Sequence, residues 1–133
     1  MSTLMKMDHI GIAVANLEEA LAIYSRLGFA SGQQEIVPAQ KVRTAALAIG
    51  ESNLELLEPM EEDSPVGKFI ASRGQGVHHL AFRVDNIEEK LQELHVAGFR
   101  LIDRKPRLGA GGARVAFLHP QGTLGTLIEL VER

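Results

Sequence analysis

The chain contains no cysteine, no tryptophan and a single tyrosine. Without cysteine it has neither a disulfide framework nor a thiol nucleophile. It also lacks a basic run and any basic stretch interleaved with aromatic residues, and its formal net charge is −3. Nucleic acid is therefore not an expected partner, because phosphate binding needs a concentrated basic face.

Long apolar runs are missing as well. No stretch approaches the roughly 18 apolar residues that a membrane span requires, and residues 1–6 lack the apolar core of a signal peptide. We therefore expect a cytoplasmic protein with no membrane partner. With 45% hydrophobic and 23% charged residues, the 133 residues can form one domain with a normal core over residues 1–133.

The main feature that is present is an internal repeat. Residues 8–21 are echoed by residues 78–91 at a constant offset of 70, and the offset continues to Gly28-Phe29 and Gly98-Phe99. The identical pairs at this offset are His9/His79, Val14/Val84, Asn16/Asn86, Glu18/Glu88, Glu19/Glu89 and Leu21/Leu91. Self-similarity at a fixed offset indicates a duplicated structural module.

Each copy predicts the order βαβββ, and hence an α+β fold made of two modules. The first module covers about 7–58, a linker about 59–76, and the second module about 77–131. Asn16 and Asp85 or Asn86 are the predicted helix N-caps, and Gly28 and Gly98 follow the helices. The predicted strands are 7–14, 30–37, 42–49, 53–58, 77–84, 99–103, 113–118 and 125–131, and the predicted helices are 17–26, 64 or 65–73 and 87–97.

The duplicated strands also duplicate two polar residues. Each module has a histidine on its first strand and a glutamate on its last, and these residues are His9, Glu55, His79 and Glu129. If a pseudo-twofold axis relates the modules, the four side chains could converge. Two imidazoles and two carboxylates suit a borderline divalent ion and leave positions open for water or substrate. Strand alternation places small Gly11, Ala13 and Ala81 on the histidine side.

Simpler interpretations exist for each residue alone. A histidine at a strand start is more often hydrogen-bonded or exposed than a ligand, and a glutamate between leucines usually faces solvent. Recurrence in both modules favours the ligand interpretation. His78 is the rival of His79, but the offset selects His79 and alternation turns His78 to the other face. His95 is expected to be a solvated helix residue, and His119 a turn residue before Pro120.

The sequence resembles the methylmalonyl-CoA epimerases of the vicinal oxygen chelate (glyoxalase) superfamily over nearly its whole length. The two modules and the four ligands are common to the superfamily, whereas the basic, glycine-rich loop and the His-Pro pair are more specific. The matching segments are Asp8–Val14, Glu55–Pro59, Asp63–Pro65, His78–Val84, Lys105–Gly112 and Phe117–Pro120.

The resemblance implies paired βαβββ units that form a curved mixed sheet around a metal cleft, usually in a homodimer. It implies an enzyme that interconverts the 2R and 2S forms of methylmalonyl-CoA by removing the α-proton. Known members use a cobalt-type ion; Mn²⁺, Ni²⁺ and Zn²⁺ are alternatives. We expect Lys105 and Arg107 to bind the phosphates of the acyl-CoA substrate, although a solvated basic loop is the simpler alternative.

The resemblance also assigns the proton-transfer residues. Glu129 matches one catalytic glutamate of the family. The other is expected in the loop 38–41, where this chain has Ala39. Glu35 and Glu55 are the candidates for the second base, and we favour Glu55 because the pseudo-twofold would place it across the metal from Glu129.

Three other functions share the fold. Glyoxalase I uses the same two-histidine, two-glutamate chemistry, but its usual first-strand arginine is not evident beside His9. A metal-free small-molecule binding protein should lose the ligands and commonly stacks its ligand on aromatic residues, which are scarce here. A ring-cleaving dioxygenase uses two histidines and one carboxylate, and a fourth ligand would crowd that site.

Overall fold

The computed structural model describes residues 2–30 and 32–133. Contacts divide the chain into two compact units, which we call the N-terminal unit (His9–His78) and the C-terminal unit (residues up to Asp8 together with His79–Arg133). In chain order the elements are β1 (Leu4–Ala13), α1 (Leu17–Leu27), β2 (Gln33–Val37), β3 (Val42–Ile49), β4 (Ser52–Pro59), α2 (Pro65–Arg73), β5 (Gly76–Val84), α3 (Ile87–Val96), β6 (Arg107–Leu108), β7 (Arg114–Leu118) and β8 (Ile128–Glu132).

Three short 3₁₀ turns, at Pro38–Gln40, Ala110–Gly112 and Pro120–Thr123, complete the described elements. The unit boundaries fall inside β1 and β5, immediately before His9 and His79. Each of these two strands therefore contributes residues to both units.

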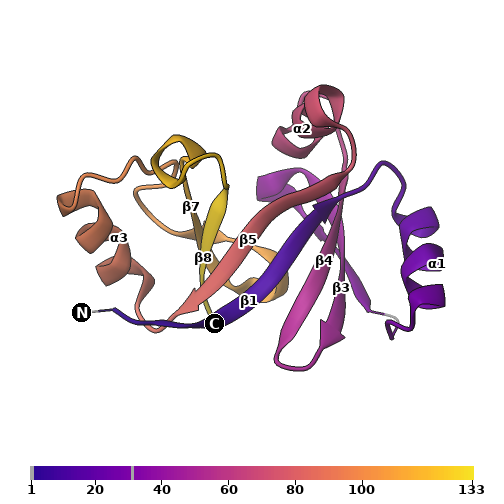
Figure 1. Cartoon of the computed structure of the whole chain (residues 1–133), viewed down its shortest axis with the longest axis horizontal. Helices are drawn as coiled ribbons and strands as arrows, with labels where there is room; N and C mark the ends of the chain where they lie inside the picture. The colour runs from indigo at the N-terminus through magenta and orange to yellow at the C-terminus, as the bar shows by residue number, and fades with distance from the viewer. Residues whose placement is uncertain (1, 31) are drawn as a thin grey trace. The chain divides into compact units, whose positions relative to one another are not determined.

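The N-terminal unit has a four-stranded arrangement in the order β2-β3-β4-β1, in which β1 and β4 are parallel and the other neighbours antiparallel. Helix α1 covers one face (Figure 1), and its Leu17 and Ala20 pack there against strand residues. The strand residues of this core cluster are Ala45, Leu47 and Leu56. The face opposite α1 carries side chains that are not part of this core cluster.

The C-terminal unit repeats this plan in the order β5-β8-β7-β6, and its first and last module strands, β5 and β8, are again parallel. Ile87 and Leu91 of α3 pack against one face. The strand residues beneath them are Val84, Ala116, Leu118 and Leu130. The predicted pair of βαβββ modules is confirmed.

Both module helices begin in the same way. The side chains of Asn16 and Asn86 accept hydrogen bonds from the backbone N–H groups of Glu19 and Glu89, at 2.9 and 3.0 Å. These bonds satisfy amide groups that have no partner within the helix. The predicted caps are therefore confirmed, with Asn86 rather than Asp85 as the second.

The end of each last strand supports the same helix start. Glu58 accepts the N–H of Leu17 at 2.8 Å and pairs with Arg43. In the second module Glu132 accepts the N–H of Ile87 at 2.9 Å and pairs with Arg114. The carboxylates of Glu88 and Glu132 raise the pKa of the Arg114 guanidinium, because it donates hydrogen bonds to both. The duplication therefore extends to these tertiary contacts.

The N-terminal residues belong to the C-terminal unit. The Thr3 N–H and the Ser2 hydroxyl both donate to the Asp85 carboxylate, at 2.9 and 2.8 Å. These bonds lower the pKa of Asp85, with the Thr3 backbone N–H as the larger cause. The start of the chain is thus fastened beside the N-terminus of α3.

The prediction of a strand over 99–103 is wrong. Only Leu101 forms an isolated bridge, to Leu118, and the short edge strand β6 lies further on, at Arg107–Leu108. Asp103 explains the difference, because its side chain accepts the Phe117 N–H at 2.9 Å. The Phe117 carbonyl receives the N–H groups of both Ile102 and Asp103. A side chain thus replaces a backbone partner, and the regular ladder is interrupted.

The other predictions of elements differ from the structure mainly at their ends. Strand β1 begins at Leu4 rather than at residue 7, and β8 begins at Ile128 rather than at residue 125. The predicted linker helix is present as α2, with Ser64 as its N-cap. None of the helices in the described part of the chain combines the length and apolar composition needed to cross a membrane.

Candidate metal and active site

In the N-terminal unit, His9 on β1 faces Glu55 on β4. The two strands run parallel, and their register places Glu55 opposite Gly11. The His9 Nε2 atom lies 3.6 Å from the Glu55 Oε2 atom, and the two side chains are only 5% and 9% exposed. Gly11, two residues after the histidine, has no side chain that could separate the pair.

The C-terminal unit contains the same construction. Strands β5 and β8 run parallel, and Glu129 lies opposite Ala81, two residues after His79. The His79 Nε2 atom lies 3.0 Å from the Glu129 Oε1 atom, with exposures of 3% and 4%. Each unit therefore contains a buried histidine–glutamate pair with a small residue between its members.

The pairs lie on the sheet faces opposite the module helices α1 and α3. Along each strand alternate residues share a face, so His9, Gly11 and Ala13 lie together, as do His79 and Ala81. Ile12, from the other face of β1, packs against the core cluster beneath α1. We call these two faces the histidine faces. The predicted position of the small residues is confirmed.

The histidine face of the C-terminal unit also carries an aromatic residue whose role the sequence did not suggest. Phe117 lies opposite Glu129 in the β7–β8 register. Its ring meets the His79 ring edge to face, with centroids 5.6 Å apart and planes at 84°. The Arg107 guanidinium lies 5.5 Å from the centre of the Phe117 ring. Strand alternation, combined with the β7–β8 pairing, is the signal that would have placed Phe117 here.

The corresponding position in the other module is very different. There Glu55 lies opposite Ala46 on β3, so a methyl group stands where the second module has a phenyl ring. The neighbouring strand therefore fills less of the space beside Glu55 than beside Glu129.

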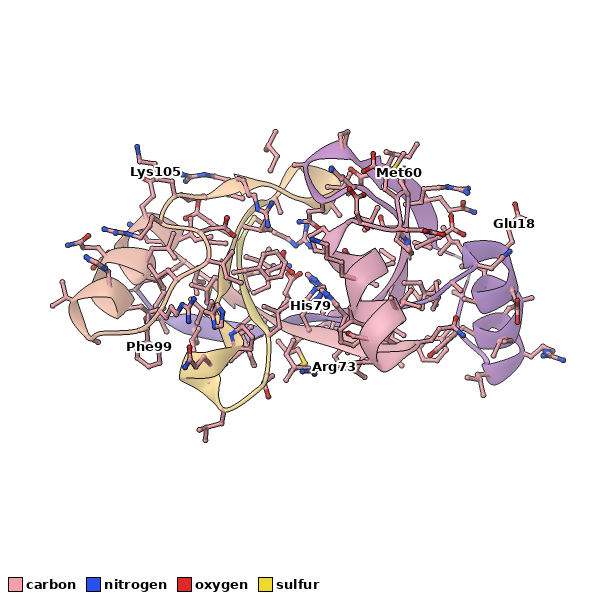
Figure 2. The ribbon with its side chains drawn as sticks, turned by 90° about the horizontal axis from the view of Figure 1, so that it is seen from above. Glu18, Met60, Arg73, His79, Phe99 and Lys105 are labelled. Atoms are coloured by element: carbon pink, nitrogen blue, oxygen red, sulfur yellow. The ribbon has the colours of Figure 1, made fainter. Side chains whose placement is uncertain are left out.

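The two basic residues predicted to bind CoA lie on opposite sides of the C-terminal sheet. Arg107 pairs with Val115 in the β6–β7 register, and that position is on the histidine face. Lys105 instead lines a cavity of about 810 Å³ on the α3 side, together with Arg104, Arg114 and His95. Figure 2 shows the Lys105 side chain directed outward from its loop.

The remaining histidines have structural roles. His78 turns away from His79, as predicted, and packs edge to face on Phe69 of α2, with ring centroids 4.9 Å apart. His95 lies on the exposed side of α3, with its Nε2 atom 3.2 Å from Arg104. The His119 Nδ1 atom accepts a backbone N–H two residues further on, which confirms its role in a turn.

The candidates for a second base differ in burial. Glu55 is buried, whereas Glu35 is exposed on the edge strand β2 and Ala39 is exposed in a 3₁₀ turn. The register pairs Glu35 with Thr44, and Thr44 with Leu57, so Glu35 shares the histidine face of its unit with Glu55.

The chemistry of the donors fits a divalent ion. Each pair offers an imidazole nitrogen and a carboxylate oxygen from side chains that are almost fully buried. Imidazole with carboxylate is a donor set that binds Co²⁺, Ni²⁺, Zn²⁺ and Mn²⁺. Each of the two pairs could therefore contribute ligands to such an ion.

Comparison with known proteins defines the class. Residues 8–117 match the Glyoxalase/Bleomycin resistance protein/Dioxygenase superfamily, and the chain belongs to it. Its paired βαβββ modules are the α+β fold of that superfamily, as the sequence predicted.

Its relatives within the superfamily are more specific. The chain is 34% identical to mitochondrial methylmalonyl-CoA epimerase of Bos taurus, over 94% of this chain and 73% of the bovine protein. It is 46% identical to the uncharacterized protein YqjC of Bacillus subtilis, over 96% and 91% of the two chains. A solved structure of Streptomyces coelicolor methylmalonyl-CoA epimerase, a glutamate-to-leucine variant in complex with 2-nitronate-propionyl-CoA, is 40% identical, with a TM-score of 0.94 over 98% and 95% of the chains. The predicted resemblance to these epimerases is confirmed.

Proposed function

We propose that the protein is an enzyme that interconverts the 2R and 2S forms of methylmalonyl-CoA with the help of a divalent ion. The buried histidine–glutamate pair, present once in each module, is the observation that carries the proposal. Similarity to the epimerases along nearly the whole chain supports the choice of substrate. In keeping with the sequence analysis, we propose that the enzyme acts as a homodimer in the cytoplasm.

The ion is proposed to bind His9, Glu55, His79 and Glu129. Support comes from their burial, from the same pairing in both modules, and from the Nε2 atom facing the carboxylate in each pair. Co²⁺ is the first choice, and Mn²⁺, Ni²⁺ and Zn²⁺ are alternatives. When bound, such an ion acts as a Lewis acid that stabilises the negative charge developing on the thioester.

Inversion at the α-carbon needs a base on one side of the substrate and an acid on the other. Glu129 is proposed to remove or return the α-proton on one side, and Glu55 on the other. Both carboxylates are buried, so water is kept from competing for the proton. Glu129 would serve both as a ligand of the ion and as a group that accepts or returns the proton.

The acyl-CoA substrate also carries phosphates at a distance from the reacting carbon. Arg107 is proposed to bind a phosphate on the histidine face, and Lys105 another at the edge of the loop. Charged side chains beside flexible glycine backbone suit phosphate oxygens. Because the two residues lie on opposite sides of the sheet, each is expected to contribute separately.

The function is tested by solvent exchange. In deuterated water the Co²⁺-loaded protein should place deuterium at the α-carbon of methylmalonyl-CoA, and a chelator should stop the exchange. The methylglyoxal–glutathione adduct should remain unchanged under the same conditions, as followed by NMR. Conversion of the adduct without exchange would identify a glyoxalase I instead, and binding without any turnover a small-molecule binding protein.

The ligand set is tested at the adjacent histidines. His79→Ala should abolish stoichiometric Co²⁺ binding in calorimetry, because the imidazole paired with Glu129 is lost. His78→Ala is the matched control and should keep full metal content, since His78 packs on Phe69. Retention of the metal in His79→Ala together with its loss in His78→Ala would show that the repeat alignment is wrong by one residue.

Glu129→Gln tests proton transfer separately from metal binding. The amide keeps the shape and one oxygen donor but cannot accept the proton. We expect the variant to retain measurable metal and to lose epimerisation by about 10²-fold or more. If Glu129 serves one side of the substrate, one epimer should lose α-proton exchange far more than the other. Turnover near that of the wild type in the metal-loaded variant would leave Glu55 or Glu35 as the base.

Lys105→Ala and Arg107→Ala test phosphate binding. Each should raise KM for the CoA substrate about tenfold, the cost of one charge-assisted contact, and leave metal content unchanged. Lys68→Ala, an exposed lysine on α2, is the control and should leave KM unchanged. An unchanged KM in both loop variants would assign Lys105 and Arg107 to a solvated loop.

A further inference from the structure

One buried acid takes no part in the proposed reaction. Asp8 is 1% exposed, and two arginines surround its carboxylate. Arg83 donates to Oδ1 through Nε and Nη2, at 3.1 and 2.9 Å. Arg133 donates through Nε to Oδ1 and through Nη2 to Oδ2, both at 2.9 Å. We call Asp8, Arg83 and Arg133 the Asp8 cluster; all three belong to the C-terminal unit.

The positions of the two arginines in the sequence are informative. Arg83 follows His79 by four residues on β5, and Arg133 follows Glu129 by four residues, immediately after β8. Asp8 is therefore held by the two strands that carry the histidine–glutamate pair of its own unit. Asp8 is also the residue immediately before His9, which belongs to the other unit.

The Asp8 cluster is not part of the repeated framework. At the offset of 70, the counterparts of Asp8 and Arg83 are His78 and Ala13. At the offset of 74 that relates Glu55 to Glu129, the counterpart of Arg133 is Pro59. The N-terminal unit therefore has no equivalent of this cluster, and His78, its counterpart of Asp8, packs on Phe69 instead. The cluster is an addition to the duplicated module.

Stability alone does not account for such a cluster. Burying a charge costs several kcal/mol, and well-packed apolar residues often stabilise a fold as well as a buried ion pair does. What paired guanidinium–carboxylate hydrogen bonds add is a defined geometry, and the Arg133–Asp8 pair is bidentate. The first part of β1 is held at its other end too, where Ser2 and Thr3 bind Asp85. This segment is thus fastened to the C-terminal unit at both ends.

We propose that the Asp8 cluster is a positioning device for His9. By fixing the backbone one residue before His9, it holds the imidazole in the orientation that metal binding needs. Adjacent Cα atoms are 3.8 Å apart across a trans peptide, so little freedom remains between the fixed carboxylate and the ligand. The inference rests on the proposed metal site and adds three residues to it as positioning residues rather than ligands.

Arg83→Met and Arg133→Met provide the test, because both side chains are about one-third exposed and their loss should leave the protein folded. We expect each variant to bind Co²⁺ about 10- to 100-fold more weakly in calorimetry, the usual cost of losing a group that orients a ligand. Arg43→Met is the matched control: Arg43 also pairs with a carboxylate, Glu58, but in the N-terminal unit. It should lower the melting temperature without changing Co²⁺ affinity.

A second measurement does not depend on the metal. In the metal-free protein, hydrogen–deuterium exchange of the peptide covering β1 should rise in Arg83→Met and Arg133→Met and stay unchanged in Arg43→Met. Arg83→Lys should restore only part of the Co²⁺ affinity, since an ammonium group cannot form the paired hydrogen bonds. Asp8→Asn, which removes both ion pairs, should show the largest change if it folds.

The outcomes separate the two proposals. Wild-type Co²⁺ affinity in both folded arginine variants would overturn the positioning role and leave the metal site intact. Equal losses of affinity in Arg43→Met would also overturn it, by showing a general effect of stability. Wild-type protein that binds no Co²⁺ would instead overturn the metal site, and the positioning role with it.

Discussion

The parallel pairing of the first and last strand of each module is the constraint on which the site depends. It places a glutamate opposite the residue two positions after a histidine, and that residue is Gly11 in one module and Ala81 in the other. Any larger side chain there would occupy the space between imidazole and carboxylate. The helix of each module covers the other face, so the same arrangement supplies the core and leaves the polar pair a face of its own.

The two modules share the contacts that hold their helices, but they differ around the two buried carboxylates. The asparagine caps and the glutamates that receive the first helix amide recur in both modules. The surroundings of the two carboxylates do not recur, since Phe117 lies opposite Glu129 and Ala46 opposite Glu55. The two bases proposed here, Glu55 and Glu129, need not be equivalent, because they are proposed to act on opposite sides of the substrate. The strands pair in the same way in both modules, but the neighbouring side chains differ, so the two carboxylates have different environments.

The charges of the C-terminal unit are arranged around strand ends. Arg83 and Arg133 meet at Asp8, and Arg114 joins Glu88 and Glu132 at the start of α3. Such contacts contribute little to stability when they are exposed, but a buried, bidentate carboxylate holds its neighbours in one geometry. A metal site needs this kind of precision, because affinity depends on how well the ligands are oriented in advance.

The sequence by itself determined the modules, their helix caps and the four candidate ligands. The repeat and the alternation of residues along each strand are patterns that can be seen in the sequence alone. It also separated His79 from His78. Tertiary structure alone decided the pairing partners. The edge strand is β6 and not the predicted 99–103, because the Asp103 side chain accepts the Phe117 N–H. The β7–β8 register places Phe117 on the face of His79, where the two rings pack edge to face. Asp8 accepts a hydrogen bond from Arg133, which is 125 residues away in the sequence. Contacts of this kind depend on the register between strands that are far apart in the sequence, and a local sequence pattern does not predict that register.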